Sequence, residues 1–410
     1  MATEALLRDD DDEREDAVDK IVRHADALST RLQAIRRQLY PPQAAKTLRT
    51  FTPNEVAALI GIPAPTLRKM TLEGKGPEPA RLENNHRAYT LAQMNELRRY
   101  LAEHRPSEAT IFVPRRQMHE HLQVVALANF KGGSAKTTTS VHFAHYLALK
   151  GFRVLAIDLD PQASMSAMFG HQPEFDVGDN ETIYGAMRYD DDRRSIRDVI
   201  RPTYFDGLDL IPGGAEVMEF EHDTPKVLAT KGGADTIFFD RLREAIGEVG
   251  DDYDIVVLDT PPSLGFLTLS ALYAATGLVV TVHPAMLDVA SMSQFLLMMG
   301  DLASTLREAG ARMENDFVRY LLTRHDPNDQ AQVKIASMLR AQFPDDVLMP
   351  TSIQSAAVEI AGLSKRTLYE IEAGEVQRNT LKRARESVDA VNEGLLDLIL
   401  DAWGRKRGSA

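Results

Sequence analysis

The sequence predicts an α/β fold in which helices flank a mostly parallel sheet, preceded by an N-terminal helix and a winged helix-turn-helix. Three observations carry this prediction. Apolar strand patterns at 124–128 and 154–157 enclose a glycine turn and a helical pattern, which together make a βαβ unit. Capped helices, a tight turn and a hairpin pattern occupy residues 46–110. The 410 residues, 44% of them apolar, suffice for two or three domains with a large core.

The charge balance and the lack of cysteine exclude several classes of protein. With 47 Lys and Arg against 60 Asp and Glu, the chain carries a net charge of −13, which argues against a surface that is basic throughout. Because the chain has no cysteine, it cannot form disulfides, thiol nucleophiles or cysteine-ligated zinc and iron–sulfur sites. The acidic first residues lack the apolar run of a signal peptide, and we expect a cytoplasmic protein.

One stretch, residues 260–287, contains no Asp, Glu, Lys or Arg and is long enough to span a bilayer. However, prolines and glycines divide it into a helix-like part (LTLSALYAAT) and a strand-like part (LVVTVH). This pattern favours a buried helix that leads into a buried parallel strand. We therefore predict no membrane span.

Residues 1–45 are predicted to form an acidic arm followed by an amphipathic helix that ends before Pro41 and Pro42. The apolar stripe of this helix consists of Ala17, Ile21, Ala25, Leu28, Leu32 and Ile35. Such a stripe needs a partner surface. Self-association of two chains and docking on the same chain are equally compatible with the pattern.

Residues 46–110 have the layout of a winged helix-turn-helix, which reads DNA with its second helix and its wing. A capping box at 52–55 starts the first helix, which breaks at Gly61. A hairpin is expected through 81–89, followed by a third helix that is capped by Thr90 with Gln93 at its third position. The turn, second helix and wing resemble the MerR-type DNA-binding module, although Pro63 stands where that family more often has Ser or Thr. The residues expected to contact DNA are Thr66, Arg68, Lys69, Arg87 and Tyr89.

The local charge supports this interpretation. Residues 41–116 contain twelve basic and seven acidic residues, a net charge of +5, which leaves −18 for the rest of the chain. A basic module within an acidic protein is what a local DNA reader requires. The alternative is a small helical interaction domain with a solvated charged face.

After a linker at 111–122, residues 123–410 are predicted to form a P-loop ATPase domain that binds ATP and Mg²⁺. Gly132 and Gly133 allow successive backbone N–H groups to point at phosphate oxygens, and the next helix adds its positive N-terminus. Lys136 is expected to reach the β- and γ-phosphates, and Thr137 to place its hydroxyl on Mg²⁺. The full nucleotide-binding set is Lys131, Gly132, Gly133, Ser134, Ala135, Lys136, Thr137 and Thr138.

This loop departs from the ordinary Walker A motif, because Phe130 and Ala135 occupy its two glycine positions. The sequence fits the deviant form Lys-Gly-Gly-x-x-Lys-Thr, in which Lys131 is an additional lysine. If Gly132 and Gly133 make the turn, Ala135 needs no positive φ. We therefore expect nucleotide binding to survive the alanine.

Carboxylates follow two later strand patterns. Asp160 lies just past the strand that ends at Asp158, and Asp259 closes the strand of 255–258. Ligands of open parallel sheets bind at these strand ends. We expect Asp259 to hold Mg²⁺ through a water molecule, and Asp160 to orient the attacking water as a catalytic residue together with Lys131 and Lys136. The alternative is that both acids only cap their strands.

Taken together, these motifs resemble the ParA/MinD branch of P-loop ATPases. The greatest resemblance is to ParA-type plasmid partition proteins with an N-terminal DNA-binding domain, in particular the RepA partition ATPases of repABC replicons. The resemblance covers nearly the whole chain and is carried by segments such as YPPQAAKTLRTFT, HLQVVALANFKGGSAKTTTS, RVLAIDLDPQASMSA and DYDIVVLDTPPSLGFLTLSAL.

The resemblance implies an ATP-dependent homodimer in which Lys131 of each subunit crosses to the phosphates of the other. It also implies non-specific binding of the dimer to nucleoid DNA, hydrolysis stimulated by a ParB-like centromere-binding protein, and operon autorepression through the winged domain. The alternative is an ATP-sensing transcriptional repressor that moves no cargo.

Four further patterns have structural or functional interpretations. His142 and His145 are three residues apart, and packing is favoured over metal binding because no third ligand stands at suitable spacing. Residues 358–374 imitate a second helix-turn-helix, but the family resemblance places them after the last ATPase strand, where helices and a loop pack beside the nucleotide base. The basic residues of 378–385 are either solvated or in contact with DNA. The C-terminal helix, with Asp397 and Asp401 on its polar face, is expected to dock on the core rather than on a membrane.

Overall fold

The computed structural model describes residues 16–39, 46–81, 87–129, 131–230, 238–308, 310, 313–372 and 374–405. The chain divides into two units, Met1–Ala45 and Lys46–Ala410. In the first unit, helix α1 (Ala17–Leu39) confirms the predicted helix. Its apolar residues Ile21 and Leu28 are 67% and 64% exposed. The partner of this stripe stays an open prediction.

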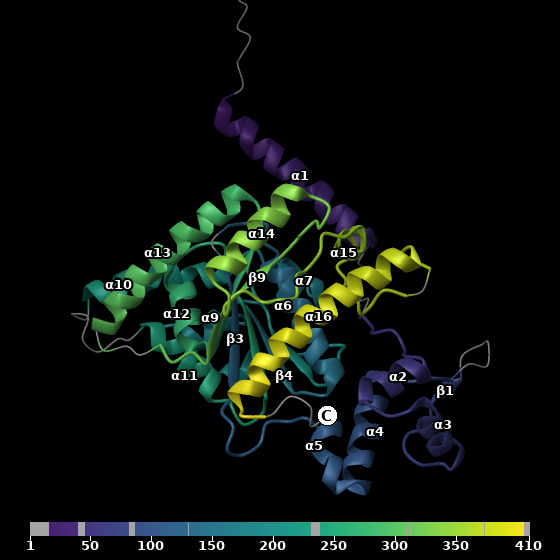
Figure 1. Ribbon diagram of the computed structural model, residues 1–410. Coiled ribbons are helices and arrows are strands. Elements are labelled where there is room, and N and C mark those ends of the chain that lie inside the picture. Colours follow the sequence, from purple (N-terminus) through teal and green to yellow (C-terminus); the bar gives the residue numbers. More distant parts are fainter. Residues whose placement is uncertain are drawn as a thin grey trace, which may run out of the picture. The chain divides into compact units, whose positions relative to one another are not determined.

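The second unit is built on a seven-stranded sheet with the order β5-β6-β4-β7-β3-β8-β9 (Figure 1). Only β5 runs antiparallel to its neighbour, and the other described pairs are parallel, so the predicted fold class is confirmed. The strands are β3 (Gln123–Ala128), β4 (Val154–Asp158), β5 (Arg201–Pro202), β6 (Leu208–Ile211), β7 (Ile255–Asp259), β8 (Gly277–Val282) and β9 (Phe317–Leu322).

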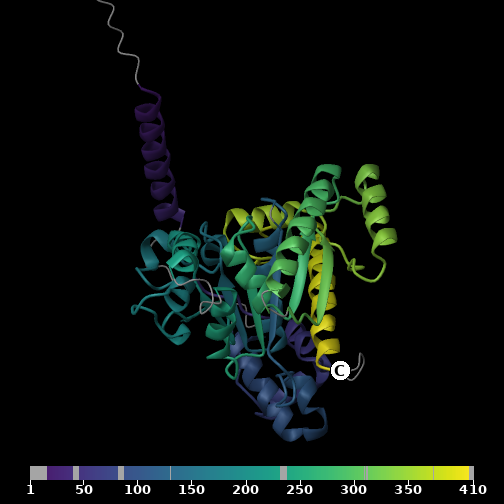
Figure 2. The same cartoon turned by 90° about the vertical axis from the view of Figure 1, so that its left-hand side faces the viewer.

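Helices cover both faces of this sheet (Figures 1 and 2). Successive strand residues alternate between two cores: Val125 and Leu127 point into one, while Val124 and Ala126 point into the other. Helices α6 and α16 belong to the first core and α12 to the second. The longer helices are α6 (Lys136–Lys150), α10 (Met218–Thr230), α11 (Arg241–Gly247), α12 (Phe266–Ala274), α13 (Met286–Glu308), α14 (Gln330–Gln342), α15 (Ala356–Leu363) and α16 (Arg378–Ala402), and short helices are α5 (Ala109–Phe112), α7 (Ser164–Met168), α8 (Pro173–Asp176) and α9 (Ile183–Met187).

The N-terminal module of this unit contains the helices and the wing strands that its sequence predicts. Both predicted capping boxes are present, at Thr52–Glu55 and at Thr90–Gln93, and Gly61 ends the first helix at φ 81°. The elements are α2 (Pro53–Ile60), α3 (Ala64–Leu72), β1 (Ala80–Arg81), β2 (Arg87–Ala88) and α4 (Leu91–His104). The module shares the core of α6, so it is packed on the sheet-bearing domain rather than tethered to it.

The structure answers the questions raised by three segments: residues 260–287, residues 358–374 and the C-terminal helix. Residues 260–287 form α12 and β8, as predicted, and no helix in the described ranges is long and apolar enough to cross a membrane. The segment that imitates a second helix-turn-helix contains only α15, because residues 364–376 are not helical where described. The C-terminal helix docks as predicted: Trp403 is 6% exposed and its Nε1 donates to the carbonyl of His121 at 2.9 Å.

Candidate functional site

The phosphate-binding loop joins the end of β3 to the start of α6. Gly132 and Gly133 are exposed between these elements, and Gly133 has a φ of 79°. Ser134, by contrast, is buried: its Oγ lies 3.1 Å from the Thr281 hydroxyl, and its carbonyl accepts a bond from the Thr323 hydroxyl at 3.0 Å. The loop is therefore anchored to the ends of β8 and β9. Its glycines are left facing solvent.

Two anchors of this loop were not singled out from the sequence. The Asn129 side chain donates to the carbonyl of Thr281 at 2.6 Å and accepts the N–H of Lys131 at 3.0 Å. Arg324 donates to the carbonyl of Gly133 at 3.1 Å. Asn129 is adjacent to the motif and was a possible candidate, whereas Arg324 lies far along the chain and carries no motif. Both side chains hold the backbone of the loop through these bonds.

The backbone at Ala135 contradicts the expectation drawn from the sequence. Ala135 has φ 65° and ψ 26°, the left-handed conformation, and it directly precedes α6. The preceding glycine pair does not complete the turn, so the position keeps the geometry for which a glycine is suited. A left-handed alanine costs roughly 1–2 kcal/mol because its Cβ crowds the following carbonyl. This strain lies within the candidate nucleotide site.

Ala135→Gly is therefore expected to raise the free energy of unfolding by up to about 1 kcal/mol, because glycine removes the left-handed strain. Ala144→Gly is the matched control, since Ala144 lies in the interior of α6. There the same substitution is expected to cost about 1 kcal/mol or more. Urea denaturation measures both. A less stable Ala135→Gly protein would contradict the strain.

Lys136 and Asp259 face each other beneath the loop. Lys136 is 6% exposed, and burial lowers its pKa, although Asp259 and Asp160 act in the opposite direction. Asp259 ends β7 and is fully buried, with the Ser140 hydroxyl donating to its Oδ1 at 3.1 Å. Burial, followed by the charge of Asp158, raises the pKa of Asp259 well above its usual range.

The donor set here fits a hard divalent cation. Oδ2 of Asp259 is buried without a hydrogen-bond partner among the described residues, and the Thr137 hydroxyl bonds to the same carboxylate. A buried carboxylate with an unused oxygen beside a hydroxyl is the chemistry that Mg²⁺ coordinates, directly or through water. This placement supports the pair Thr137 and Asp259, although their role as metal-site residues stays a prediction.

The two carboxylates after β4 differ in their surroundings. Asp158 is fully buried and accepts bonds from the Ser166 N–H at 2.8 Å and the Ser166 hydroxyl at 2.7 Å. Its oxygens hold α7 in place. Asp160 is 9% exposed and accepts the Gln162 N–H at 2.9 Å with one oxygen, Oδ1. Of the two, only Asp160 has an oxygen that accepts no hydrogen bond from the described residues, so we retain it as the residue proposed to orient water.

Lys131 is held by its own chain. Its Nζ lies 2.8 Å from Oδ2 of Asp288, a residue at the start of α13, and its side chain is 37% exposed. The sequence carries no signal for this partner. To reach the phosphates of another subunit, as the resemblance implies, Lys131 must exchange this ion pair for a new one.

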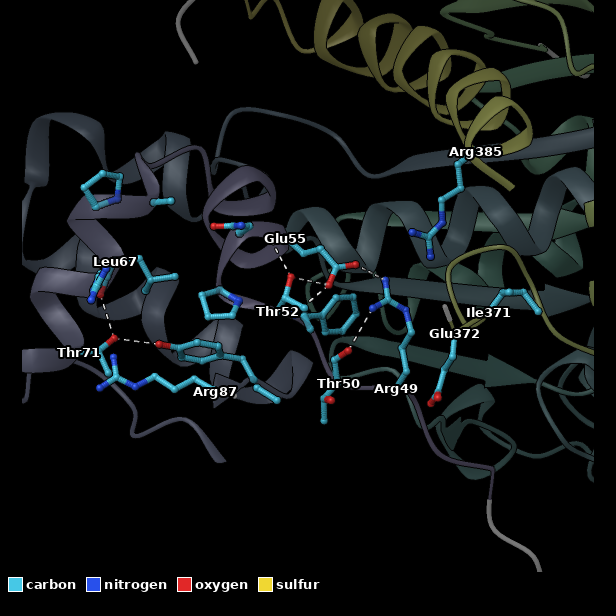
Figure 3. A pocket seen from close by; sticks show the side chains of 18 of the residues that line it. Arg49, Thr50, Thr52, Glu55, Leu67, Thr71, Arg87, Ile371, Glu372 and Arg385 are labelled. Carbon is cyan, nitrogen blue, oxygen red and sulfur yellow. Dashed lines mark hydrogen bonds and ion pairs between the residues drawn. The ribbon is translucent and has the colours of Figure 1, made fainter. Parts of the chain in front are cut away.

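The five residues expected to contact DNA do not all lie at the surface. Arg68 and Lys69 are exposed on α3, while Thr66 and Arg87 are partly buried. Arg68 and Arg87 border an open groove of about 1320 Å³ that also reaches Leu381 and Arg385 of α16 (Figure 3). Tyr89 is only 1% exposed, and its hydroxyl lies 2.9 Å from that of Thr71. We therefore remove Tyr89 from the candidate DNA contacts, because its ring packs in the module's core.

Both α6 histidines are packed, as the spacing predicts. His142 bonds to the carbonyl of Thr138 and to the N–H of Leu368, and His145 stacks on Phe205 at a centroid distance of 3.8 Å. In the described part of the chain, no group of three or more His, Cys, Asp or Glu residues could hold a metal ion.

Comparisons with known proteins place the chain. A family model described as an AAA domain matches residues 122–309, and one described as MerR family regulatory protein matches 52–89. A Sinorhizobium fredii protein named "Putative replication protein A" is 47% identical over 95% of both chains. SopA of Escherichia coli K12 is 30% identical over 80% of this chain and 82% of its own. This chain belongs to the ParA family of partition ATPases.

Solved structures agree on the fold of this ParA-family chain. A structure described as a partition protein covers 93% of this chain and 99% of its own, with a TM-score of 0.65 at 20% identity. The complex of a Cyanothece McdA variant with ATP covers 70% of this chain and 98% of its own, with a TM-score of 0.54 at 17% identity. At these identities the likeness establishes the fold. Family membership, together with the P-loop, makes the chain an ATPase.

Proposed function

We propose that this ParA-family protein is an ATP-driven DNA partition protein. The observation that carries the proposal is that the candidate nucleotide site and the winged module share one hydrophobic core. The first part is the phosphate-binding loop with its two lysines, followed by α6, and the buried carboxylates Asp160 and Asp259. The second part is the basic recognition helix α3, whose buried side chains lie in the same hydrophobic core as those of α6. A nucleotide that moves α6 would therefore act directly on the body that carries the DNA reader.

The hydrolysis chemistry uses residues already in place. Lys136, with the N–H groups at the start of α6, would bind the β- and γ-phosphates of ATP. Mg²⁺, held by Thr137 and through water by Asp259, would neutralise charge on those phosphates. Asp160 would orient a water molecule. The oxygen of this water would attack the γ-phosphorus while the bond from the γ-phosphorus to the β–γ bridging oxygen breaks, giving ADP and phosphate. Support for the ATP and Mg²⁺ assignment also comes from a Mycobacterium smegmatis cobyrinic acid a,c-diamide synthase with a bound ATP analogue and magnesium, 25% identical with a TM-score of 0.51.

The proposed cycle links this chemistry to DNA. Two ATP-bound chains form a dimer in which Lys131 of each neutralises charge developing on the phosphates of the other, as an arginine finger does. The dimer binds nucleoid DNA in the cytoplasm without sequence preference. A ParB-like partner stimulates hydrolysis and releases it, and the winged module represses the operon from its control region.

The test of this proposal is a binding measurement with two DNA probes. With ATP and Mg²⁺, the protein should bind a random-sequence duplex, and it should release that duplex after ATP is removed. A duplex covering the control region upstream of its own coding sequence should bind more tightly than the random one at equal salt. Binding that depends neither on ATP nor on sequence would contradict the proposal.

The groove residues of the winged module yield a further prediction. Arg68→Ala and Arg87→Ala should each weaken binding to the control-region duplex by about 5- to 150-fold, since base or phosphate contacts by arginine are worth about 1–3 kcal/mol. Fluorescence anisotropy measures the dissociation constants. Arg243→Ala, in α11, is the matched control, because Arg243 is paired with Asp240 away from the groove. Equal affinities for wild type and both groove variants would remove this face from DNA recognition.

A further inference from the structure

Residues 367–370 form a buried loop between α15 and α16, which we call the bridging loop. It belongs to the segment whose sequence imitates a second helix-turn-helix. In the described chain it is not helical, yet Thr367 and Leu368 have no exposed surface and Glu370 is 4% exposed. The loop contacts α6 on one side and the entry to the winged module on the other. Neither the fold class nor the ATPase chemistry explains so much polar burial.

On the α6 side, His142 connects the bridging loop to the nucleotide site. Its Nδ1 lies 2.7 Å from the carbonyl of Thr138, and its Nε2 lies 3.1 Å from the N–H of Leu368. Because a carbonyl only accepts and an N–H only donates, the ring is neutral with its proton on Nδ1. Burial lowers the pKa of His142 to about 4, which agrees with this state. Thr138 directly follows Thr137, so the ring is bonded to the first turn of the phosphate-binding helix.

On the other side, Arg49 connects the bridging loop to the winged module; Figure 3 shows its side chain next to Glu55. Its Nε donates to the carbonyl of Tyr369 at 2.9 Å, and its NH2 group donates to Oε1 of Glu55 at 2.8 Å. Glu55 also accepts the backbone N–H of Thr52 at 2.9 Å, and this bond belongs to the capping box that starts α2. Hydrogen bonds therefore run from the first turn of α6 to the first turn of the helix-turn-helix.

A second row of contacts runs beside the first. His145 Nδ1 lies 2.9 Å from the Thr367 hydroxyl, and the Thr367 N–H donates to Oε2 of Glu370 at 2.7 Å. The other oxygen of Glu370 pairs with Lys46 at 2.7 Å, at the point where the chain enters the winged module. Lys46 also donates to the carbonyls of Met168 and Lys365. This second row also passes through the bridging loop, but it starts at His145, further along α6. The row through His142 is therefore the one that reaches the first turn of α6.

The bond from the Leu368 N–H to His142 is buried and the bonds of Arg49 to Tyr369 and Glu55 are part-buried. Leaving a buried partner of such a bond unpaired costs about 1–3 kcal/mol, so these bonds transmit displacement. If phosphate binding shifts the first turn of α6, the bridging loop must either follow the shift or leave buried polar atoms unpaired. The loop can follow only by carrying Arg49 and Lys46 with it.

We propose that the bridging loop, with His142 and Arg49 as positioning residues, couples nucleotide occupancy of the P-loop to the DNA affinity of the winged module. This inference rests on the proposed function and adds the route of its regulation. His142 and Arg49 need not touch nucleotide. Their role is to hold the first turn of α6 and the first turn of α2 in one hydrogen-bonded row.

The experiment compares DNA affinity with and without nucleotide in the full-length protein. The readout is the ratio of the dissociation constants of the control-region duplex without and with ADP or ATP. For the wild type this ratio should depart from one by at least about fivefold, the lower range of allosteric coupling. In His142→Asn, which can still donate to Thr138 but is too short to reach Leu368, the departure should fall below about twofold. The affinity for ATP, measured by fluorescent-nucleotide binding, should stay within about twofold.

Arg49→Gln cuts the row at its other end and should cause the same loss of nucleotide dependence. Any direct effect of Arg49 on DNA binding would change both dissociation constants and leave their ratio intact. Tyr253→Phe is the matched control, because it removes one part-buried side-chain bond, from the Tyr253 hydroxyl to Asp209 at 2.7 Å, outside both rows. Its ratio should equal that of the wild type. If His142→Asn does not fold, Arg49→Gln alone decides.

Two outcomes overturn the inference: a wild-type ratio kept by both variants, or a wild-type ratio of one in a protein that binds ATP and DNA. Failure of the wild type to bind ATP or DNA at all would fall on the proposed function instead. The two failures are therefore distinguishable in the same set of titrations.

Discussion

Lys136→Gln is expected to abolish ATP-dependent dimerisation and to weaken ATP binding by at least about 100-fold. The lysine is 6% exposed at the first position of α6 and burial lowers its pKa, so its charge lies in a partly desolvated site, where we propose that it binds the phosphates. Charge-assisted hydrogen bonds are worth about 1.5–3 kcal/mol each, and glutamine keeps much of the length of the side chain while removing the charge. Light scattering with ATP and Mg²⁺ measures the dimer.

Lys150→Gln is the matched control for this variant. Lys150 lies at the other end of the same helix, with its Nζ 5.2 Å from the ring centre of Tyr146. The same loss of charge there should leave dimerisation unchanged. Thr137→Ala should reproduce the loss seen in Lys136→Gln, because the Thr137 hydroxyl is the proposed metal ligand. Undiminished dimer formation by Lys136→Gln would remove this lysine from the nucleotide site.

Lys131→Ala is expected to bind ATP with near wild-type affinity but to hydrolyse it at least tenfold more slowly in the presence of the partner protein. The reason is that the proposed role of Lys131 lies in the transition state, where it neutralises charge on the phosphates of the other subunit. Partner-stimulated phosphate release is the measurement. Normal turnover by Lys131→Ala would exclude the lysine from catalysis.

Asp288→Asn tests whether Lys131 must leave its ion pair with Asp288 in order to act on the phosphates of the other subunit. In the present structure the ion pair with Asp288 holds Lys131 at 2.8 Å, and the substitution weakens that hold without changing the size of the side chain. Its turnover should match or exceed that of the wild type. A rate as low as that of Lys131→Ala would show instead that the ion pair itself supports the site.

Much of the fold was predictable because its signals are local and repeated. The glycine turn between strand and helix, the carboxylates at strand ends and the two capping boxes each depend on residues a few positions apart. All of them lie where the pattern places them. The alternation of Val124 and Val125 between two cores follows from the pleat of a strand covered on both faces.

What could not be predicted depends on long-range packing. The left-handed backbone of Ala135 was not predicted, because the glycine pair before it was expected to complete the turn, although the ordinary motif has glycine at this position. Tyr89 belongs to the wing in sequence, but its side chain is buried and its hydroxyl is hydrogen-bonded to that of Thr71. Asp288 was not identified because it lies far along the chain from Lys131 and carries no motif.

In the bridging loop, the sequence pattern suggests a helix-turn-helix that the structure does not form. Its helix-turn-helix-like sequence is realised only as α15, because Thr367, Leu368 and Glu370 make their hydrogen bonds to α6 and to the winged module instead of to a second helix. Tertiary contacts override local propensity there. The family resemblance, which places the segment after the last ATPase strand and beside the nucleotide base, did not predict these contacts.

The most direct test of the account is the rate of ATP hydrolysis by the intact protein, measured alone, with DNA, with the protein encoded by the neighbouring gene, and with both. A partition ATPase should turn over slowly alone and accelerate at least about tenfold when DNA and the partner are both present, since the partner completes transition-state stabilisation. A rate that is indifferent to both would contradict the account and favour an ATP-sensing repressor.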